Sequence, residues 1–443
     1  MQDWSMHTRR RFGFGVGTLL ITTAVMFGGT SASAAPLPNH TRLVSTNSAG
    51  ASGNSASDES AISSNGRYVV FKSSATDLVP GFATNDNYQV YERDLHTGST
   101  VPVSIASPGV GSGGWSPAVS ADGRYVAFVL RLPGGGQYGD VYVRDMKAGA
   151  TKLASEAVGG GAPDGESLEP SISGDGRFVA FTSLADDLVA NDTNGVSDVF
   201  VVDLATGITV RASVGKDGLE GDGPSVSPAI NADGRYVAFA TTAASLLRGS
   251  RTGMRSSIVR RDMELRRTIV VSRQHPGEVR GSYEPAISAD GNTVAYTFQL
   301  WGEHLERQGY ARLEVDNLLT GAAVVAPIVA SRCGDLTSSA CSNRVALSAD
   351  GTTAAVPGCL RQTSPRPHCQ YKGDVVWVFR TASGQIEDAS APKASPNRGF
   401  RFSSVALDAT GNRVVYATSA SNLDRPDHNG VSDVFVHQVA VTM

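Results

Sequence analysis

The chain has 443 residues, of which 18% are charged, and its formal net charge is −4 at pH 7. This slightly acidic balance argues against a nucleic-acid partner, because phosphate binding needs a concentrated basic face. Six arginines do gather between Arg251 and Arg267, but Asp262 and Glu264 interleave them, which favours a solvated surface over a binding patch.

The first 34 residues are predicted to be a signal peptide. Arg9 to Arg11 precede an apolar segment over residues 12–29, and Ala32-Ser33-Ala34 forms a small-residue cleavage site. The run from Thr8 to Phe12 also resembles a twin-arginine export signal, so that route and ordinary secretion both stay open. We therefore expect a protein that is secreted or held in the cell envelope, with no stable membrane span after cleavage.

A short strand is expected at the mature N-terminus, over Thr41–Ser45. Its sequence resembles the fourth strands of later repeats, Thr151–Ser155 and Thr268–Ser272, whereas the last repeat lacks a good fourth strand of its own. We predict that this N-terminal strand completes the last repeat, because closing a ring removes the open edges that invite aggregation. Pairing by Val439–Met443 is the alternative.

A repeated motif fills the mature part of the chain, residues 35–443. Its clearest copies are Ser120 to Phe128 (SADGRYVAF), Ser173 to Phe181 and Asn231 to Phe239. A steady period indicates a repeat architecture, in which each unit buries its apolar face against its neighbours. The shared glycines recur every 53 to 60 residues, at Gly66, Gly123, Gly176, Gly234, Gly291, Gly351 and Gly411.

Each repeat encodes four short strands. In the third they are expected at Pro170–Ser173, Arg177–Thr182, Asp198–Asp203 and Ile208–Ser213, all rich in residues typical of strands. Asp-Gly joins the first two strands and Thr-Gly the last two, and no stretch keeps a helical period. The sequence therefore predicts an all-β fold, a seven-bladed β-propeller of four-stranded antiparallel blades, closed by the N-terminal strand.

A polar rim is predicted at one end of the channel, just before the first strand of each blade. Three glutamates among polar residues would attract cations, basic peptides or sugar hydroxyls, and Trp115, Tyr283 and Trp301 could add stacking surface. A solvated loop rim is the alternative. The candidate ligand-binding residues are Glu59, Ser116, Glu169, Ser227, Glu284 and Asn343, with Ser403 in the last blade.

Two matched acidic loops precede the third strand in two repeats. Oxygen ligands at positions 1, 3 and 7, with a glycine for the bend, resemble the first half of a calcium loop. No bidentate glutamate follows, so an Asx-type turn is the alternative to a calcium site. The candidate metal ligands are Asp192, Asn194 and Asp198 in one loop and Asp427, Asn429 and Asp433 in the other.

All four cysteines, Cys333, Cys341, Cys359 and Cys369, lie in the sixth repeat. An even number in an exported chain predicts disulfides. We favour Cys333–Cys341 and Cys359–Cys369, although three connectivities are possible. A zinc site with His368 is the alternative, but the cysteines lack the close spacing of structural zinc ligands.

The repeat resembles that of a known family. The pattern Pro-x-Ile-Ser-x-Asp-Gly-Arg-Tyr-Val-Ala-Phe, followed by Asp140 to Asp145 (DVYVRD), is similar to the TolB-like, WD-repeat-like propeller family over residues 41–438. That resemblance implies protein-binding or scaffold roles, with catalysis usually in a separate domain. The motif is specific for fold and not for function.

No catalytic residues are predicted, since the histidines are scattered and no metal-binding pair or nucleophile elbow is present. Propeller enzymes, however, draw their groups from different blades and leave no local motif. We expect a monomeric binding or scaffold module with a protein or glycan partner in the envelope or outside it. The alternative is a hydrolase or lyase acting on polysaccharide, lactone or ester at the channel mouth.

Overall fold

The described part of the chain is built from β-strands. The computed structural model describes residues 40–439, except for 83, 85–87, 108–109, 112, 132–137, 216–217, 248–255, 274–279, 301–309, 331–344, 361–374, 391–401, 422 and 425–428. All of these described residues belong to one compact unit, Pro38–Met443. Among them, no helix has the length and apolar character needed to cross a membrane.

The first four blades are four-stranded antiparallel sheets in which consecutive strands pair. Blade 1 comprises β2 (Ser57–Ile62), β3 (Tyr68–Ser73), β4 (Gln89–Asp94) and β5 (Thr100–Pro102), and the hairpin β6 (Ile105–Ser107) with β7 (Val110–Gly111) comes after it. Blade 2 comprises β8 (Trp115–Val119), β9 (Tyr125–Leu130), β10 (Asp140–Asp145) and β11 (Ala150–Leu153). Blade 3 comprises β12 (Ser167–Ile172), β13 (Phe178–Ser183), β14 (Asp198–Asp203) and β15 (Ile208–Arg211). Blade 4 comprises β16 (Ser225–Ile230), β17 (Tyr236–Thr241), β18 (Ser257–Asp262) and β19 (Arg267–Val270).

Blades 5 and 6 are joined into one eight-stranded sheet, because the outer strand of blade 5 pairs with the second strand of blade 6 over Ile328–Ala330. Blade 5 comprises β20 (Arg280–Ile287), β21 (Thr293–Leu300), β22 (Tyr310–Asn317) and β23 (Ala323–Ala330). Blade 6 comprises β24 (Ala346–Leu347), β25 (Thr353–Leu360), β26 (Val375–Arg380) and β27 (Ile386–Asp388). Blade 7 comprises β28 (Phe402–Leu407), β29 (Arg413–Thr418), β30 (Asp433–Gln438) and β1 (Thr41–Leu43).

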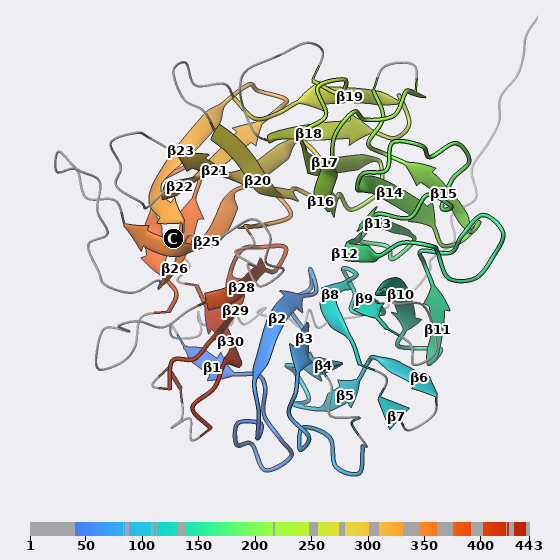
Figure 1. The fold of residues 1–443 in the computed structure, drawn as a ribbon. Helices are drawn as coiled ribbons and strands as arrows, with labels where there is room; N and C mark the ends of the chain where they lie inside the picture. Colours follow the sequence, from blue (N-terminus) through green and yellow to red (C-terminus); the bar gives the residue numbers. More distant parts are fainter. Residues whose placement is uncertain are drawn as a thin grey trace, which may run out of the picture. The chain divides into compact units, whose positions relative to one another are not determined.

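The first strand of each blade lies toward the middle of a ring, where β2, β8, β12, β16, β20 and β28 face one another (Figure 1). The seven-bladed propeller predicted from the repeat is thereby confirmed. A first strand runs from one end of the ring to the Asp-Gly turn at the other. The turns between third and fourth strands therefore lie at the same end as the Asp-Gly turns.

The N-terminal strand closes the ring, as predicted. β1 pairs antiparallel with β30 in a register that places Thr41 opposite His437 and Leu43 opposite Phe435. Just beyond it, the Ser45 hydroxyl donates to Asp433 Oδ1 at 2.6 Å, and the Val44 amide donates to the Val434 carbonyl. Of the alternative closing segment, Val439–Met443, residues 440–443 lie outside the described residues.

A backbone hydrogen bond joins the turn between the first and second strands of each blade to the same turn of the next blade. The donor amide belongs to the second turn residue, except in blade 1, where it belongs to the third. Small residues suit this position, because a Cβ on Gly174 would already lie 3.3 Å from the Ala232 Cβ. In the described residues the bonds run Ala409 to Ser64, Asn65 to Ala121, Ala121 to Gly174, Gly174 to Ala232, Ala232 to Ala289, Ala289 to Ala349 and Ala349 to Ala409, at 2.8–3.2 Å.

The turn glycines also provide the contact surface for the preceding blade. Gly176 has a φ of 74°, and a Cβ there would lie 2.2 Å from Cδ2 of Tyr125. The same contact joins Gly123 to Tyr68 and Gly234 to Phe178. Only glycine satisfies both the left-handed backbone and the close approach of the ring.

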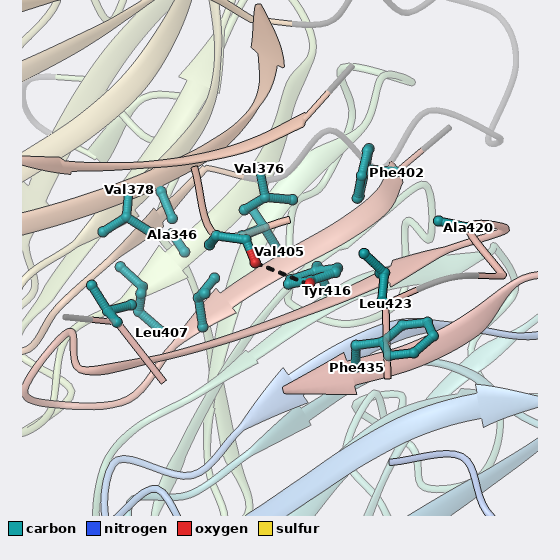
Figure 2. Packing of buried hydrophobic residues seen from close by; sticks show 14 of the residues in the cluster. Ala346, Val376, Val378, Phe402, Val405, Leu407, Tyr416, Ala420, Leu423 and Phe435 are labelled. Atoms are coloured by element: carbon teal, nitrogen blue, oxygen red, sulfur yellow. Dashed lines mark hydrogen bonds between the residues drawn. The ribbon is translucent and has the colours of Figure 1, made fainter. Parts of the chain in front are cut away.

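The core lies between blades. In β9, Val126, Ala127 and Phe128 are all fully buried, because neighbouring blades cover both faces of a second strand. Figure 2 shows this packing between blades 6 and 7, where Val376 of β26 faces β28 and Tyr416 of β29. The buried Tyr416 hydroxyl donates to the Ala389 carbonyl at 3.0 Å, so the polar end of this aromatic side chain is satisfied.

We expect Gly176→Ala to lower the free energy of unfolding by about 2–4 kcal/mol, since it combines left-handed strain with a clash against Tyr125. Gly207→Ala is the matched control, because its φ is 73° but nothing lies within 4 Å of its Cβ position. That variant should lose only about 1–2 kcal/mol. Denaturant unfolding of the mature protein measures both, and equal losses would contradict the role given to the ring contact.

Candidate functional site

The innermost strands of blades 1–5 share a β-bulge with left-handed backbone at one non-glycine residue. The φ values are 48° at Glu59, 50° at Ser116, 53° at Glu169, 55° at Ser227 and 54° at Glu284. The pairing register shifts at the same place, for example between Asp58 and Ala61. These are the rim residues named from the sequence, but they lie inside the first strands and not before them. Such backbone costs about 1–3 kcal/mol each and gathers at sites that use it.

Two of the bulge glutamates hold the neighbouring blade. Glu59 Oε2 accepts a hydrogen bond from the Ser116 amide at 2.7 Å, which joins blade 1 to blade 2. Glu169 Oε2 accepts from the Ser227 amide at 2.8 Å, which joins blade 3 to blade 4 in the same way. The carboxylate therefore sits on one blade and the amide that it binds on the next, and the bulge turns that amide toward the carboxylate.

Lys72 completes a charged network at the blade 1 bulge. Its Nζ lies 2.6 Å from Glu59 Oε1 and 3.0 Å from Asp58 Oδ1. Burial opposes the charge on Lys72, but Glu59 and Asp58 outweigh it and raise the pKa of the ammonium above its usual value. The group is therefore a fixed cation. Sequence reasoning missed Lys72, although its place in β3, opposite Asp58, follows from the hairpin register.

One aromatic side chain flanks this network, and two others lie at the same end of blade 2. Lys72 Nζ lies 4.6 Å from the centre of the Tyr88 ring, and Tyr88 is 51% exposed. On blade 2, the half-buried Trp115 packs against Gly139, where a Cβ would lie 2.8 Å from the indole. Tyr138, the preceding residue, is 46% exposed. We call the end of the ring that carries the bulges and these residues the bulged end.

The remaining rim candidates are only partly described. Tyr283 and Glu284 are half-buried in β20 of blade 5. Asn343 and Trp301 lie outside the described residues, and so does the side chain of Ser403. The structure thus brings Glu59 together with Ser116, and Glu169 with Ser227.

A guanidinium lies within the first acidic loop. Arg211 Nη1 is 2.8 Å from Asp192 Oδ1 and 3.2 Å from Asp198 Oδ2, and its Nη2 is 2.8 Å from Glu220 Oε1. The Asn194 amide donates to Asp198 Oδ2 at 2.7 Å. Arg211 therefore supplies, from β15, the positive charge that a calcium ion would otherwise bring to this loop.

The second acidic loop has different surroundings. Asn429 donates to Asp433 Oδ2 at 3.0 Å and to the Gly53 carbonyl at 2.8 Å. Leu43 takes the place of Arg211 here, since it pairs with Phe435 as Arg211 pairs with Phe200. Asp427 lies outside the described residues, and within the described part no three acidic, histidine or cysteine side chains are placed to hold a metal ion.

The cysteines cannot be paired within the described residues. Cys333, Cys341 and Cys369 lie outside them, and Cys359 is described only as part of β25.

Ordered ion pairs mark the opposite end of the ring. The arginine of each Asp-Gly-Arg turn in blades 2–4, and of the matching Asn-Gly-Arg turn in blade 1, binds the aspartate that ends the third strand, as in Arg177–Asp203 at 2.7 Å. The same arginine stacks on the aromatic residue next to it in the chain. The other pairs are Arg67–Asp94, Arg124–Asp145 and Arg235–Asp262. This arrangement indicates a structural role for these arginines.

Two buried carboxyls lie in the third strands of blades 1 and 2. Glu92 is 7% exposed, and its Oε2 has no hydrogen-bond partner among the described residues. Burial, with a smaller contribution from Asp94, raises the pKa of Glu92 to about 7. Burial also raises the pKa of Asp140 to about 6. Both groups therefore keep a proton to a higher pH than exposed carboxyls do.

Solved structures similar to this chain are propeller proteins. Oligogalacturonate lyase in complex with manganese is 12% identical with a TM-score of 0.52, covering 92% of this chain and 97% of that one. TolB from Acinetobacter baumannii is 16% identical with a TM-score of 0.39, covering 68% of this chain and 61% of that one, less than two thirds of its length. The putative TolB from Agrobacterium tumefaciens is 16% identical with a TM-score of 0.40, covering 61% and 80%.

These similarities show the propeller fold alone. TolB structures are among the neighbours. No protein-family model matches the chain, and no curated protein matches its sequence.

We expect Arg211→Ala to destabilise the mature protein by about 3–5 kcal/mol, because it leaves buried carboxylates without their cation. Arg177→Ala is the control, since its ion pair is exposed and should contribute little to stability. Melting curves in millimolar calcium and in excess chelator, for the wild type and both variants, complete the experiment. A melting temperature of Arg211→Ala equal to that of the wild type would contradict the assigned role, and a calcium-dependent rise in the wild type would support a metal at the second loop.

Glu92 should make the protein less stable as pH rises. Its folded pKa lies above the unfolded value of 4.5, so its stabilising contribution is complete below about 4.5 and is lost as pH rises through about 7. Glu92→Gln should therefore gain about 2–3 kcal/mol at pH 8 relative to wild type and little at pH 4.5. Glu156→Gln, at an exposed site, should show no such difference. Denaturant unfolding at the two pH values tests this, and parallel wild-type and Glu92→Gln profiles would contradict it.

Proposed function

We propose that the mature chain is an exported binding or scaffold protein, secreted or in the cell envelope, that holds a protein partner at the bulged end of the ring. The signal-peptide pattern of residues 1–34 supports export. The closed ring of blades supports a rigid surface, since every blade contacts its neighbours through buried side chains and backbone hydrogen bonds.

The observation that carries this proposal is the engagement of Glu59 and Glu169 with the next blade. A general acid or base must exchange protons with a substrate, whereas these carboxylates are occupied by backbone amides at 2.7 and 2.8 Å. They pre-organise the bulged end instead. A surface whose side chains are already fixed loses little conformational entropy on binding, which favours recognition of a partner.

A propeller hydrolase or lyase acting on polysaccharide, lactone or ester is the second candidate. The observation that favours it is the network of Lys72, Asp58 and Glu59, because a fixed cation beside two carboxylates can stabilise developing charge. Of the histidines that the structure describes, His40 precedes β1, His96 lies in the β4–β5 turn and His437 lies in β30, so none is on an innermost strand.

Affinity capture with residues 35–443, from the envelope and culture fluid of the source cells, tests the main proposal. We expect one protein to be enriched at a stoichiometric level. Glu169→Gln removes a charge from the bulged end and should weaken the capture about tenfold, whereas Glu264→Gln, in the β18–β19 turn at the opposite end, should leave it unchanged. Capture of no protein, together with turnover of a polysaccharide or ester, would replace the scaffold proposal by the enzyme.

A further inference from the structure

We propose that the surface around Tyr88, Lys72, Asp58, Glu59, Trp115 and Tyr138, at the bulged end of blades 1 and 2, is a saccharide-binding site. We call it the tyrosine patch. It uses two exposed aromatic side chains that the proposed protein-binding function does not require. It goes beyond that function by giving the propeller a second ligand, a carbohydrate.

Contacts and neighbours in the chain together connect the two exposed rings of the tyrosine patch. Tyr88 lies against Lys72, whose Nζ binds Glu59 Oε1, and Glu59 Oε2 in turn binds the Ser116 amide. Ser116 follows Trp115, and the indole covers Gly139, which follows Tyr138. All these residues lie where first strands begin, second strands end and third strands begin, so they share one end of their blades.

The polar atoms of the patch match hydroxyl groups. A sugar hydroxyl both donates and accepts, so it is best met where donors and acceptors alternate at hydrogen-bond distance. Here an ammonium lies between two carboxylates at 2.6 and 3.0 Å. A ligand that carries charges of one sign gains less binding energy here, because Lys72 already compensates one of the two negative charges.

The aromatic rings provide the apolar half of such a site. Lys72 lies over the Tyr88 ring, yet the residue remains 51% exposed, and Tyr138 is 46% exposed. The C–H faces of a sugar ring pack on aromatic faces, and the phenol hydroxyl can bind a neighbouring hydroxyl. Gly139 permits this geometry, since a side chain at that position would collide with Trp115 and Val129.

The backbone holds the patch rigid without a ligand. Glu59 and Ser116 both lie at left-handed bulges, and the hydrogen bond between them locks blade 1 to blade 2. The propeller itself therefore fixes the position of Glu59 against the Ser116 amide, without closure of a loop. A pre-organised site binds a ring-shaped ligand at a low entropic cost.

Binding of uncharged hexasaccharides to the mature protein tests the proposal. Cellohexaose, chitohexaose, xylohexaose and maltohexaose are titrated by calorimetry, with intrinsic fluorescence as the second readout. At least one should bind with a Kd below about 1 mM. Tyr88→Ala and Tyr138→Ala should each weaken that binding about tenfold, while Leu265→Ala, exposed in the β18–β19 turn at the opposite end, should not change it.

The outcomes separate this site from the proposed protein-binding function. Both tyrosines are exposed, so their variants should keep the wild-type melting temperature, and a loss of binding then reports on the patch. Absence of binding to all four sugars, or equal binding by wild type and the Tyr88→Ala/Tyr138→Ala double variant, overturns the proposal. If the double variant instead loses a captured protein and no sugar binds, the patch belongs to the protein interface.

Discussion

This propeller depends on one contact between neighbouring blades. A turn glycine of one blade packs against the first side chain of the second strand in the preceding blade. Gly176, which packs against Tyr125, shows the two requirements of this contact. The turn needs a residue with left-handed backbone, and the aromatic ring of Tyr125 needs the space that a Cβ would fill. The neighbouring backbone hydrogen bonds, such as Ala121 to Gly174, follow from the same approach. Once each blade is placed at this distance, the second strands are covered on both faces, which explains their uninterrupted apolar sequence.

The bulged end is a consequence of that placement. Because the blades are held at their Asp-Gly turns, the first strands converge there, and the bulges adjust their other ends. Glu59 and Glu169 then reach the amide of the next blade, so a glutamate rim that suggested free acidic groups is partly a set of connections between blades. What remains accessible is a mixture of ion-paired groups and aromatic rings beside Glu59, at Lys72, Tyr88 and Tyr138.

The acidic loops show how similar sequences can acquire different electrostatic environments. Both contain an aspartate held by an asparagine four residues earlier, at Asn194–Asp198 and Asn429–Asp433. In blade 3 the fourth strand supplies Arg211, which satisfies Asp192 and Asp198. In blade 7 the fourth strand is the N-terminal β1, which presents Leu43 at the matching register. The loop motif alone does not contain this difference, because the balancing residue lies on another strand.

The sequence by itself determined the repeat, the four strands per blade, the glycine turns and the closure by Thr41–Leu43. Each rests on a local pattern that recurs at a constant spacing, so neighbouring copies constrain one another. It also identified the rim residues, since they occupy one position in every repeat. Only the tertiary structure decided what they contact: that Glu59 binds Ser116 and Lys72, that Arg211 fills an acidic loop, and that blades 5 and 6 share a sheet. These contacts join residues from different strands or blades, and their partners depend on side-chain direction and distance across an interface, which no local pattern encodes.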